Sequence, residues 1–103
     1  MPAAPLNYLT FAFSDDGDDH ASCDAMASVR PADVAAAQAE IQTVMAWAQR
    51  HKPGRRGPEE DGGRWDAWEQ RQEEPDGWVS LTLTLTGPTA WCERLMAHFA
   101  PEA

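Results

Sequence analysis

The chain has 103 residues and a net charge of −9, from 17 acidic and 8 basic side chains. Its apolar fraction of 43% and charged fraction of 24% are those of a folded globular protein, which argues against disorder. This length predicts a single domain, residues 1–103, with a core that needs no metal or disulfide. The charge argues against direct binding of nucleic acid or of an anionic membrane, because both would repel the general surface.

The chain shows neither a basic segment followed by an apolar run at its start nor any run approaching about 18 apolar residues. We therefore expect a cytoplasmic protein without a membrane span. In that compartment Cys23 and Cys92 would stay reduced. A Cys23–Cys92 bridge is the alternative that the sequence leaves open.

The first expected element is a strand over residues 7–13. Leu9, Phe11 and Phe13 would face the core, and Tyr8, Thr10 and Ala12 the other side. A loop over residues 14–22 follows, rich in aspartate. A short second strand over residues 24–29 is weakly indicated.

Two helices are expected, and each begins at a proline. In residues 31–51 the apolar side chains recur at helical spacing: Val34, Ala37, Ile41, Val44, Met45 and Ala48. Pro31 suits a first helical turn, and Pro53-Gly54 ends the pattern. In residues 88–99 the corresponding stripe is Cys92, Leu95, Met96 and Phe99.

Between the helices lie a charged loop, residues 52–63, and two strands that should form a hairpin. Residues 64–72 form the weaker strand, with Trp65 and Ala67 facing inward. Residues 73–77 supply turn chemistry. In residues 78–86, Val79, Leu81, Leu83 and Leu85 alternate strictly with Ser80, Thr82, Thr84 and Thr86, which is typical of a strand with one solvated face.

These elements predict an α+β fold, a four-stranded antiparallel sheet with two helices on one face. The order is ββαββα, or βαββα and ferredoxin-like if the 24–29 strand is absent. In the ββαββα order each half is a hairpin that enters a helix through a proline, which suggests a pseudo-repeat. The expected core is Leu9, Phe11, Phe13, Val34, Ile41, Val44, Met45, Val79, Leu81, Leu83, Leu85, Leu95, Met96 and Phe99.

The densest cluster of potential metal ligands is Asp15, Asp16, Asp18, Asp19 and His20. Carboxylates suit calcium or magnesium, and a mixed set with Cys23 suits zinc. The spacing does not match an EF-hand, because aligning Gly17 with its glycine places Ala12 first and Cys23 last. The simpler interpretation is a solvated turn, so no cofactor is assigned and a divalent metal is the weaker alternative.

The chain carries no recognised catalytic motif, neither a nucleophile elbow, a phosphate loop, a dinucleotide fingerprint nor a zinc-protease motif. Cys92 lies in a helix stripe, where a thiol is normally inert packing. Cys23 lies beside acids that raise a thiol pKa. We therefore do not expect an enzyme.

The segment 50–56 holds four of the eight basic residues. It could bind a phosphate group, RNA or an acidic partner. The simpler interpretation is that Arg50, His51 and Lys52 stabilise a helix C-terminus, and that Arg55 and Arg56 pair loosely with the acids at positions 59–61.

Trp65 and Trp68 have opposite parity on one strand, so one of them, Trp68, should point away from the helices. It would either pack against Tyr8 or anchor an interface, for which tryptophan is favoured. The expected interface is Tyr8, Trp68, Glu69, Glu73, Glu74 and Asp76.

The sequence-based hypothesis is a small acidic interaction protein, of inhibitor or immunity type, that binds a basic protein partner. A homodimer through the open sheet face is a further possibility. The alternative function is a small ligand- or metal-binding domain that uses the Asp-rich segment 15–24.

Overall fold

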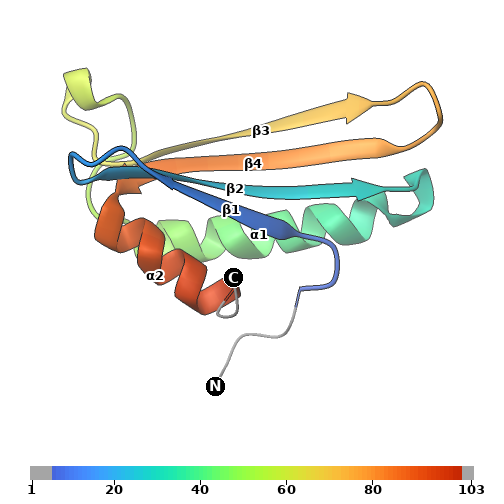
Figure 1. Ribbon diagram of the computed structural model, residues 1–103, viewed down its shortest axis with the longest axis horizontal. Coiled ribbons are helices and arrows are strands. Elements are labelled where there is room, and N and C mark those ends of the chain that lie inside the picture. The colour runs from blue at the N-terminus through green and yellow to red at the C-terminus, as the bar shows by residue number, and fades with distance from the viewer. Residues whose placement is uncertain (1–5, 101–103) are drawn as a thin grey trace.

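The computed structural model describes residues 6–100. It contains a four-stranded antiparallel sheet and two helices that lie on the same side of it, which confirms the expected fold class (Figure 1). The strands are β1 (Thr10–Asp15), β2 (His20–Val29), β3 (Asp66–Glu73) and β4 (Val79–Pro88). The helices are α1 (Val34–Arg50) and α2 (Thr89–Phe99), with 3-10 turns at Pro31–Asp33 and Glu59–Asp61.

The strand order is β1-β2-β4-β3, so the second strands of the two hairpins lie side by side in the middle of the sheet. They pair over their full length, from His20 opposite Pro88 to Val29 opposite Val79. Each then turns into a helix, β2 through Pro31 and β4 through Pro88. The ββαββα order is therefore the observed one, and the ferredoxin-like alternative is excluded.

β2 is longer than the expected short strand, and the Asp-rich loop is correspondingly shorter. β1 continues to Asp15 and β2 begins at His20, so the connection is the turn Asp16–Asp19 rather than a loop over residues 14–22. The sequence pattern underestimated β2 because its inward side chains at this end are small: Ala21, Cys23, Ala25 and Ala27. Small residues fill the space where the helices approach the sheet closely, and they give a weak hydrophobic alternation.

The core lies between the sheet and the helices, and most of its members were predicted. Nine are buried: Leu9, Val34, Ile41, Val44, Val79, Leu81, Leu83, Leu85 and Leu95. Four are partly buried against it: Phe11, Met45, Met96 and Phe99. The prediction for Phe13 is wrong, because 39% of its surface is exposed. The Phe13 side chain points to the same side of the sheet as the core residues. However, β1 is an edge strand, and the helices do not cover this position of it.

Tryptophans fill one end of the core. The rings of Trp47, Trp65 and Trp91 are all buried, and Trp91 lies 5.6 Å from Trp65 and 6.4 Å from Trp47 between ring centroids. Gly87 lets β4 pass this cluster, since a Cβ there would lie 2.7 Å from the Trp91 ring. The aromatic cluster thus fixes where α2 leaves the sheet.

The segment before β1 is fastened to α1 by one carboxylate. Glu40 accepts hydrogen bonds from the backbone N–H groups of Asn7, Tyr8 and Leu9, at 2.8–3.2 Å. Hydrogen bonds to a charged acceptor are stronger than neutral ones. Glu40 therefore sets the path by which the chain enters the sheet.

Both cysteines are free thiols and are fully buried. A hydrogen bond with Cys92, together with burial, raises the pKa of the Cys23 thiol. The same hydrogen bond lowers the pKa of Cys92. Both thiols are nevertheless fully buried, so neither is accessible to a substrate in solution. Among the described residues, neither helix has the length and the apolar character needed to cross a membrane.

Candidate functional site

The sheet face that the helices leave uncovered is called the open face here. It carries the even-numbered strand residues, because the odd-numbered ones point to the helices. Its middle is made of small uncharged side chains with one methionine and one carboxylate, Asp24: Thr10, Ala12, Ser22, Asp24, Met26, Ser28, Ser80, Thr82, Thr84 and Thr86. For a chain of charge −9, this surface carries little charge.

The carboxylates on the open-face strands are held by neighbouring side chains. Asp24 accepts a hydrogen bond of 2.7 Å from the Thr84 hydroxyl. Asp66 lies 3.1 Å from the Arg56 guanidinium, measured from oxygen to nitrogen. The outward residues of the four described strands include no lysine or arginine. The middle of the open face thus offers hydroxyl and apolar groups together with a single carboxylate, Asp24.

Two large apolar side chains stand out on this face. Trp68 on β3 is 47% exposed and Met26 on β2 is 37% exposed. Trp68 lies opposite Thr84. Tyr8 precedes β1 at the other edge of the sheet, three strand spacings or roughly 14 Å away. Trp68 therefore does not pack against Tyr8, and its ring is free to contact another molecule.

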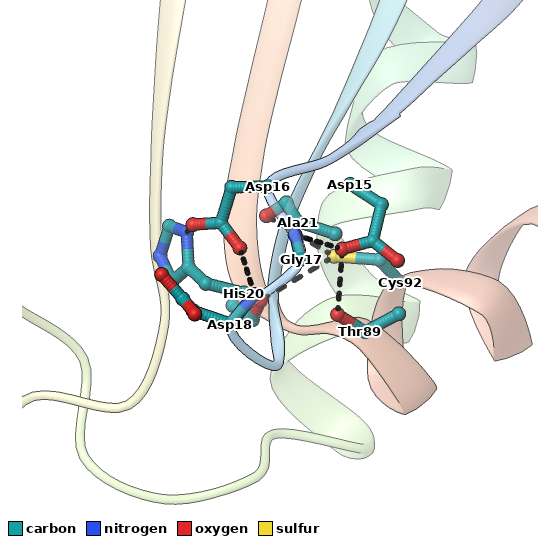
Figure 2. Close-up of polar contacts among 9 residues, drawn as sticks. Asp15, Asp16, Gly17, Asp18, His20, Ala21, Thr89 and Cys92 are labelled. Atoms are coloured by element: carbon teal, nitrogen blue, oxygen red, sulfur yellow. Dashed lines mark hydrogen bonds and ion pairs between the residues drawn. The ribbon is translucent and has the colours of Figure 1, made fainter.

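The turn between β1 and β2, Asp16–Asp19, is the first acidic turn (Figure 2). Asp15 and Asp16 each accept a hydrogen bond from the backbone N–H two residues further on, at 2.8 and 2.9 Å. The Asp16 carboxylate also lies 3.4 Å from Nδ1 of His20. Asp19 has a positive φ of 61°, which aspartate tolerates better than most residues. These contacts shape the turn itself, as expected for the solvated-turn interpretation.

The five candidate metal ligands all lie at this turn, but they do not converge. Asp15 points toward Thr89 at the start of α2, while Asp16 and His20 lie on the other side of the turn (Figure 2). Within residues 6–100, no three carboxylate, histidine or cysteine side chains gather closely enough to hold a metal ion. The arrangement gives the metal alternative no support.

The first acidic turn instead forms one wall of a hollow beside Trp68. The hollow has a volume of about 400 Å³, and its lining includes Asp18, Asp19, His20 and Asp66 together with the Trp68 ring. The opposite wall is the loop at Gly57, Pro58, Gly63 and Arg64. Carboxylates next to an exposed indole favour a cationic side chain, which both groups attract.

The turn between β3 and β4, Glu74–Gly77, is the second acidic turn. Glu74 and Asp76 line a shallow hollow of about 700 Å³ together with Trp78, Ser28 and Ser80. A neighbouring hollow of about 480 Å³ is lined by Tyr8 and Met26. The two hollows share Ser28 and Ser80 in their linings. The two hollows form a continuous groove across the open face from Tyr8 to Asp76.

The two acidic turns lie at opposite ends of the open face (Figure 1). β2 and β4 pair from His20 to Val29, so the separation is roughly 30 Å at about 3.3 Å per residue. This is several times the Debye length of about 8 Å at physiological ionic strength. Each turn therefore acts as a separate patch of negative charge, with the weakly charged middle between them.

The structure thus divides the predicted interface residues among three places. Tyr8, Glu74 and Asp76 share the groove, and Trp68 lies at the other end of the same face. Glu69 and Glu73 have the opposite parity and lie on the other side of β3. Sequence reasoning missed Met26, Ser28 and Trp78 on this face. The alternation of β2, extended along its full length, would have placed Met26 and Ser28, and the pairing of Ser28 with Ser80 would have brought them near the second acidic turn.

The basic segment follows the simpler interpretation in part. Arg50 lies in the last turn of α1, where cations are favoured by the helix dipole. Arg55 donates a hydrogen bond to the backbone carbonyl of Asp61, and Arg56 bonds to the Asp66 carboxylate and to the Ala67 carbonyl. Arg55 thus stabilises the loop by an internal hydrogen bond, and Arg56 connects the loop to β3.

The chain matches no family model, no curated protein and no solved structure. The function must therefore be inferred from the surface itself.

Proposed function

We propose that this chain is a non-enzymatic binding protein, of inhibitor or immunity type, whose open face docks against a basic protein. The observation that supports this most is the distribution of charge: a middle that carries Met26 and one carboxylate, Asp24, is flanked on β3 by the exposed Trp68, with an acidic turn at each end. Interfaces typically have an uncharged centre surrounded by a polar rim. The open face has this composition before any partner is bound.

The weakly charged middle and the Trp68 side chain beside it would supply the contact energy. Trp68 and Met26 are large and exposed, and the surrounding threonines and serines allow close approach of a flat partner surface. Tryptophan is among the residues that most often dominate binding energy in protein interfaces. The groove between Tyr8 and Trp78 offers a second place for a partner side chain.

The acidic turns would select the partner and speed its association. Each turn exposes carboxylates that are not neutralised by arginine or lysine in the described ion pairs. A partner with basic groups about 30 Å apart would match both ends, and a partner with one basic patch would match one end only. Long-range attraction of this kind raises the association rate and is screened by salt.

The test is affinity capture from host lysate on the tagged full chain, washed at about 50 mM and at about 500 mM salt. We expect a basic protein that is retained at low salt and released at high salt, because exposed charge pairs are screened at the higher ionic strength. Its binding constant is then measured for Trp68→Ala and for the turn variant Asp18→Asn/Asp19→Asn. Glu93→Gln on α2, which is exposed on the helix side, is a control that removes one negative charge away from the open face.

The expected pattern is a large loss of affinity for Trp68→Ala through faster dissociation, and a loss for the turn variant mainly through slower association. Glu93→Gln should bind normally. A captured partner that is acidic, or whose binding is unaffected by both open-face variants and by salt, would refute the proposal.

The alternative role is binding of a small ligand or a divalent metal by the Asp-rich segment 15–24. The small-ligand version rests on the hollow of about 400 Å³ beside Trp68. Its volume is within the range of ligand pockets, which is about 300–1,000 Å³. A ligand of the folded state raises the melting temperature. Thermal denaturation with millimolar calcium, magnesium or zinc decides the metal version, since an unchanged melting temperature would eliminate it.

A further inference from the structure

The two edges of the sheet differ sharply in charge. The edge strand β3 has the sequence DAWEQRQE, with four charged side chains in eight residues. The edge strand β1 has the sequence TFAFSD, in which the single charge is Asp15 at its end. Charged residues on an edge strand are a common protection against pairing with another chain. β3 is protected in this way and β1 is not.

The unpaired backbone groups of β1 can be assigned from the hairpin. Asp16 N–H bonds to the His20 carbonyl, so residues 16 and 20 form a hydrogen-bonded pair. Hydrogen-bonded pairs alternate along an antiparallel ladder, so the even residues of β1 bond to β2. The N–H and C=O groups of Phe11 and Phe13 therefore face the free edge. In the described part of the chain, β1 pairs with β2 alone.

The side chains at this edge are also apolar and accessible. Phe13 is 39% exposed, and Phe11 lies beside it on the helix side, stacked on Phe99 with 6.0 Å between ring centroids. On the open-face side the edge presents Thr10, Ala12 and Ser14, all of which are exposed. A strand of this kind offers both backbone bonds and apolar contact to an added strand.

We propose that β1 pairs with β1 of a second copy of this chain, antiparallel and about a two-fold axis at Ala12. Phe11 of one copy then forms the hydrogen-bonded pair with Phe13 of the other, and Ala12 lies opposite Ala12. Aromatic side chains paired across strands stabilise a sheet. The result is one continuous eight-stranded sheet with the two open faces side by side.

Charge favours a second copy at this edge over a basic protein. The segment Thr10–Ser14 carries no charge that a basic partner could match, whereas self-pairing of a chain with charge −9 requires a neutral strand. In the antiparallel arrangement, Asp16 of one copy lies opposite position 8 of the other. The two Asp16 residues are then roughly 25 Å apart, well beyond the Debye length.

Cysteine cross-linking tests the register. Ala12 would face Ala12 in a non-hydrogen-bonded pair, with Cα atoms about 4.5 Å apart, which a disulfide can span. We expect full-length Ala12→Cys to form a covalent dimer under a mild thiol oxidant. Thr10→Cys and Ser14→Cys should each form no covalent dimer alone and should cross-link when mixed, because position 10 faces position 14. The wild-type chain is the control, since its thiols are buried.

Substitution at the edge tests the association itself. Phe13→Pro removes an outward N–H group and the aromatic contact without removing a bond to β2, and Phe13→Lys adds a protecting charge. We expect both to shift the monomer–dimer equilibrium in sedimentation by tenfold or more toward monomer, while circular dichroism stays native. Gln70→Lys on β3 should leave the equilibrium unchanged.

The proposal is overturned if wild type is monomeric in sedimentation at hundreds of micromolar, or if Ala12→Cys cross-links no faster than Ser14→Cys alone. It is also overturned if a dimer forms that Trp68→Ala disrupts and Phe13→Lys does not, because that result assigns the contact to the open face. None of these readouts depends on the basic partner, so this proposal and the proposed function stand or fall separately.

Discussion

The two faces of β4 show how one strand divides its residues between stability and recognition. On the helix side Leu83 and Leu85 are completely buried. On the open face the neighbouring Thr82 and Thr84 are half-buried hydroxyl residues that only other strand residues surround. A core position is fixed by packing, whereas a surface position is free to serve a partner. Substitutions on the inner face should therefore lower stability. Substitutions on the open face should leave stability nearly unchanged but weaken binding.

The largest difference is expected for a charge placed on each face of β4. Leu83→Asp should leave no folded protein, because burying a carboxylate costs more than a domain of this size has in stability, about 5–15 kcal/mol. Thr82→Asp, one residue away on the open face, should fold. Circular dichroism and thermal denaturation of the two variants provide the measurement. A folded Leu83→Asp protein would contradict the assigned register of the sheet.

A smaller loss is expected at the closest approach within the core. A Cβ at Gly87 would meet the buried Trp91 ring at 2.7 Å and the Trp65 Cβ at 3.3 Å. Gly87→Ala should therefore cost about 1–3 kcal/mol in the free energy of unfolding, the usual range for overpacking. Thr86→Ala on the open face is the matched control, with an expected change within about 0.5 kcal/mol. Equal losses for the two variants in urea denaturation would show that the tryptophan cluster adapts freely.

Glu40 tests how firmly the start of β1 is attached to the helix side. Its carboxylate accepts three backbone N–H groups, so Glu40→Ala should lose about 1–2 kcal/mol in unfolding free energy. Glu40→Gln keeps an acceptor oxygen without the charge and should lose less. Amide hydrogen exchange should also accelerate at Asn7, Tyr8 and Leu9. Unchanged exchange at these amides in Glu40→Ala would indicate that the carboxylate does not hold the segment.

The sequence predicted the parts of the fold in which side-chain size alternates strongly. The period of two in β4 and the stripes of the two helices are each set by large apolar residues. β2 was underestimated because Ala21, Cys23, Ala25 and Ala27 on its inner face are small. The burial of Phe13 was predicted wrongly because the alternation of a strand indicates only to which side of the sheet a side chain points. It does not indicate whether another element packs on that side chain.

The candidate site was predictable residue by residue but not as an arrangement. Parity alone placed Trp68 on the open face, and turn chemistry placed the acids in turns. Their separation depends on the order β1-β2-β4-β3 and on the antiparallel pairing of β2 with β4, which put the two acidic turns at opposite ends. Pairing partners are tertiary information, and a single sequence with two hairpins is compatible with several strand orders.

The smallest effect on stability is expected at Trp68, where the comparison of the two faces is most direct. Trp68 and Trp65 lie three residues apart at the same end of the sheet, but Trp68 is 47% exposed and Trp65 is 4% exposed. Trp65→Ala should cost about 3–5 kcal/mol, as for a buried aromatic residue, whereas Trp68→Ala should change the unfolding free energy by less than about 1 kcal/mol. Urea denaturation measures both. A Trp68→Ala loss comparable to that of Trp65→Ala would mean that the ring serves the fold, and the open face would then lose the anchor on which the proposed partner depends.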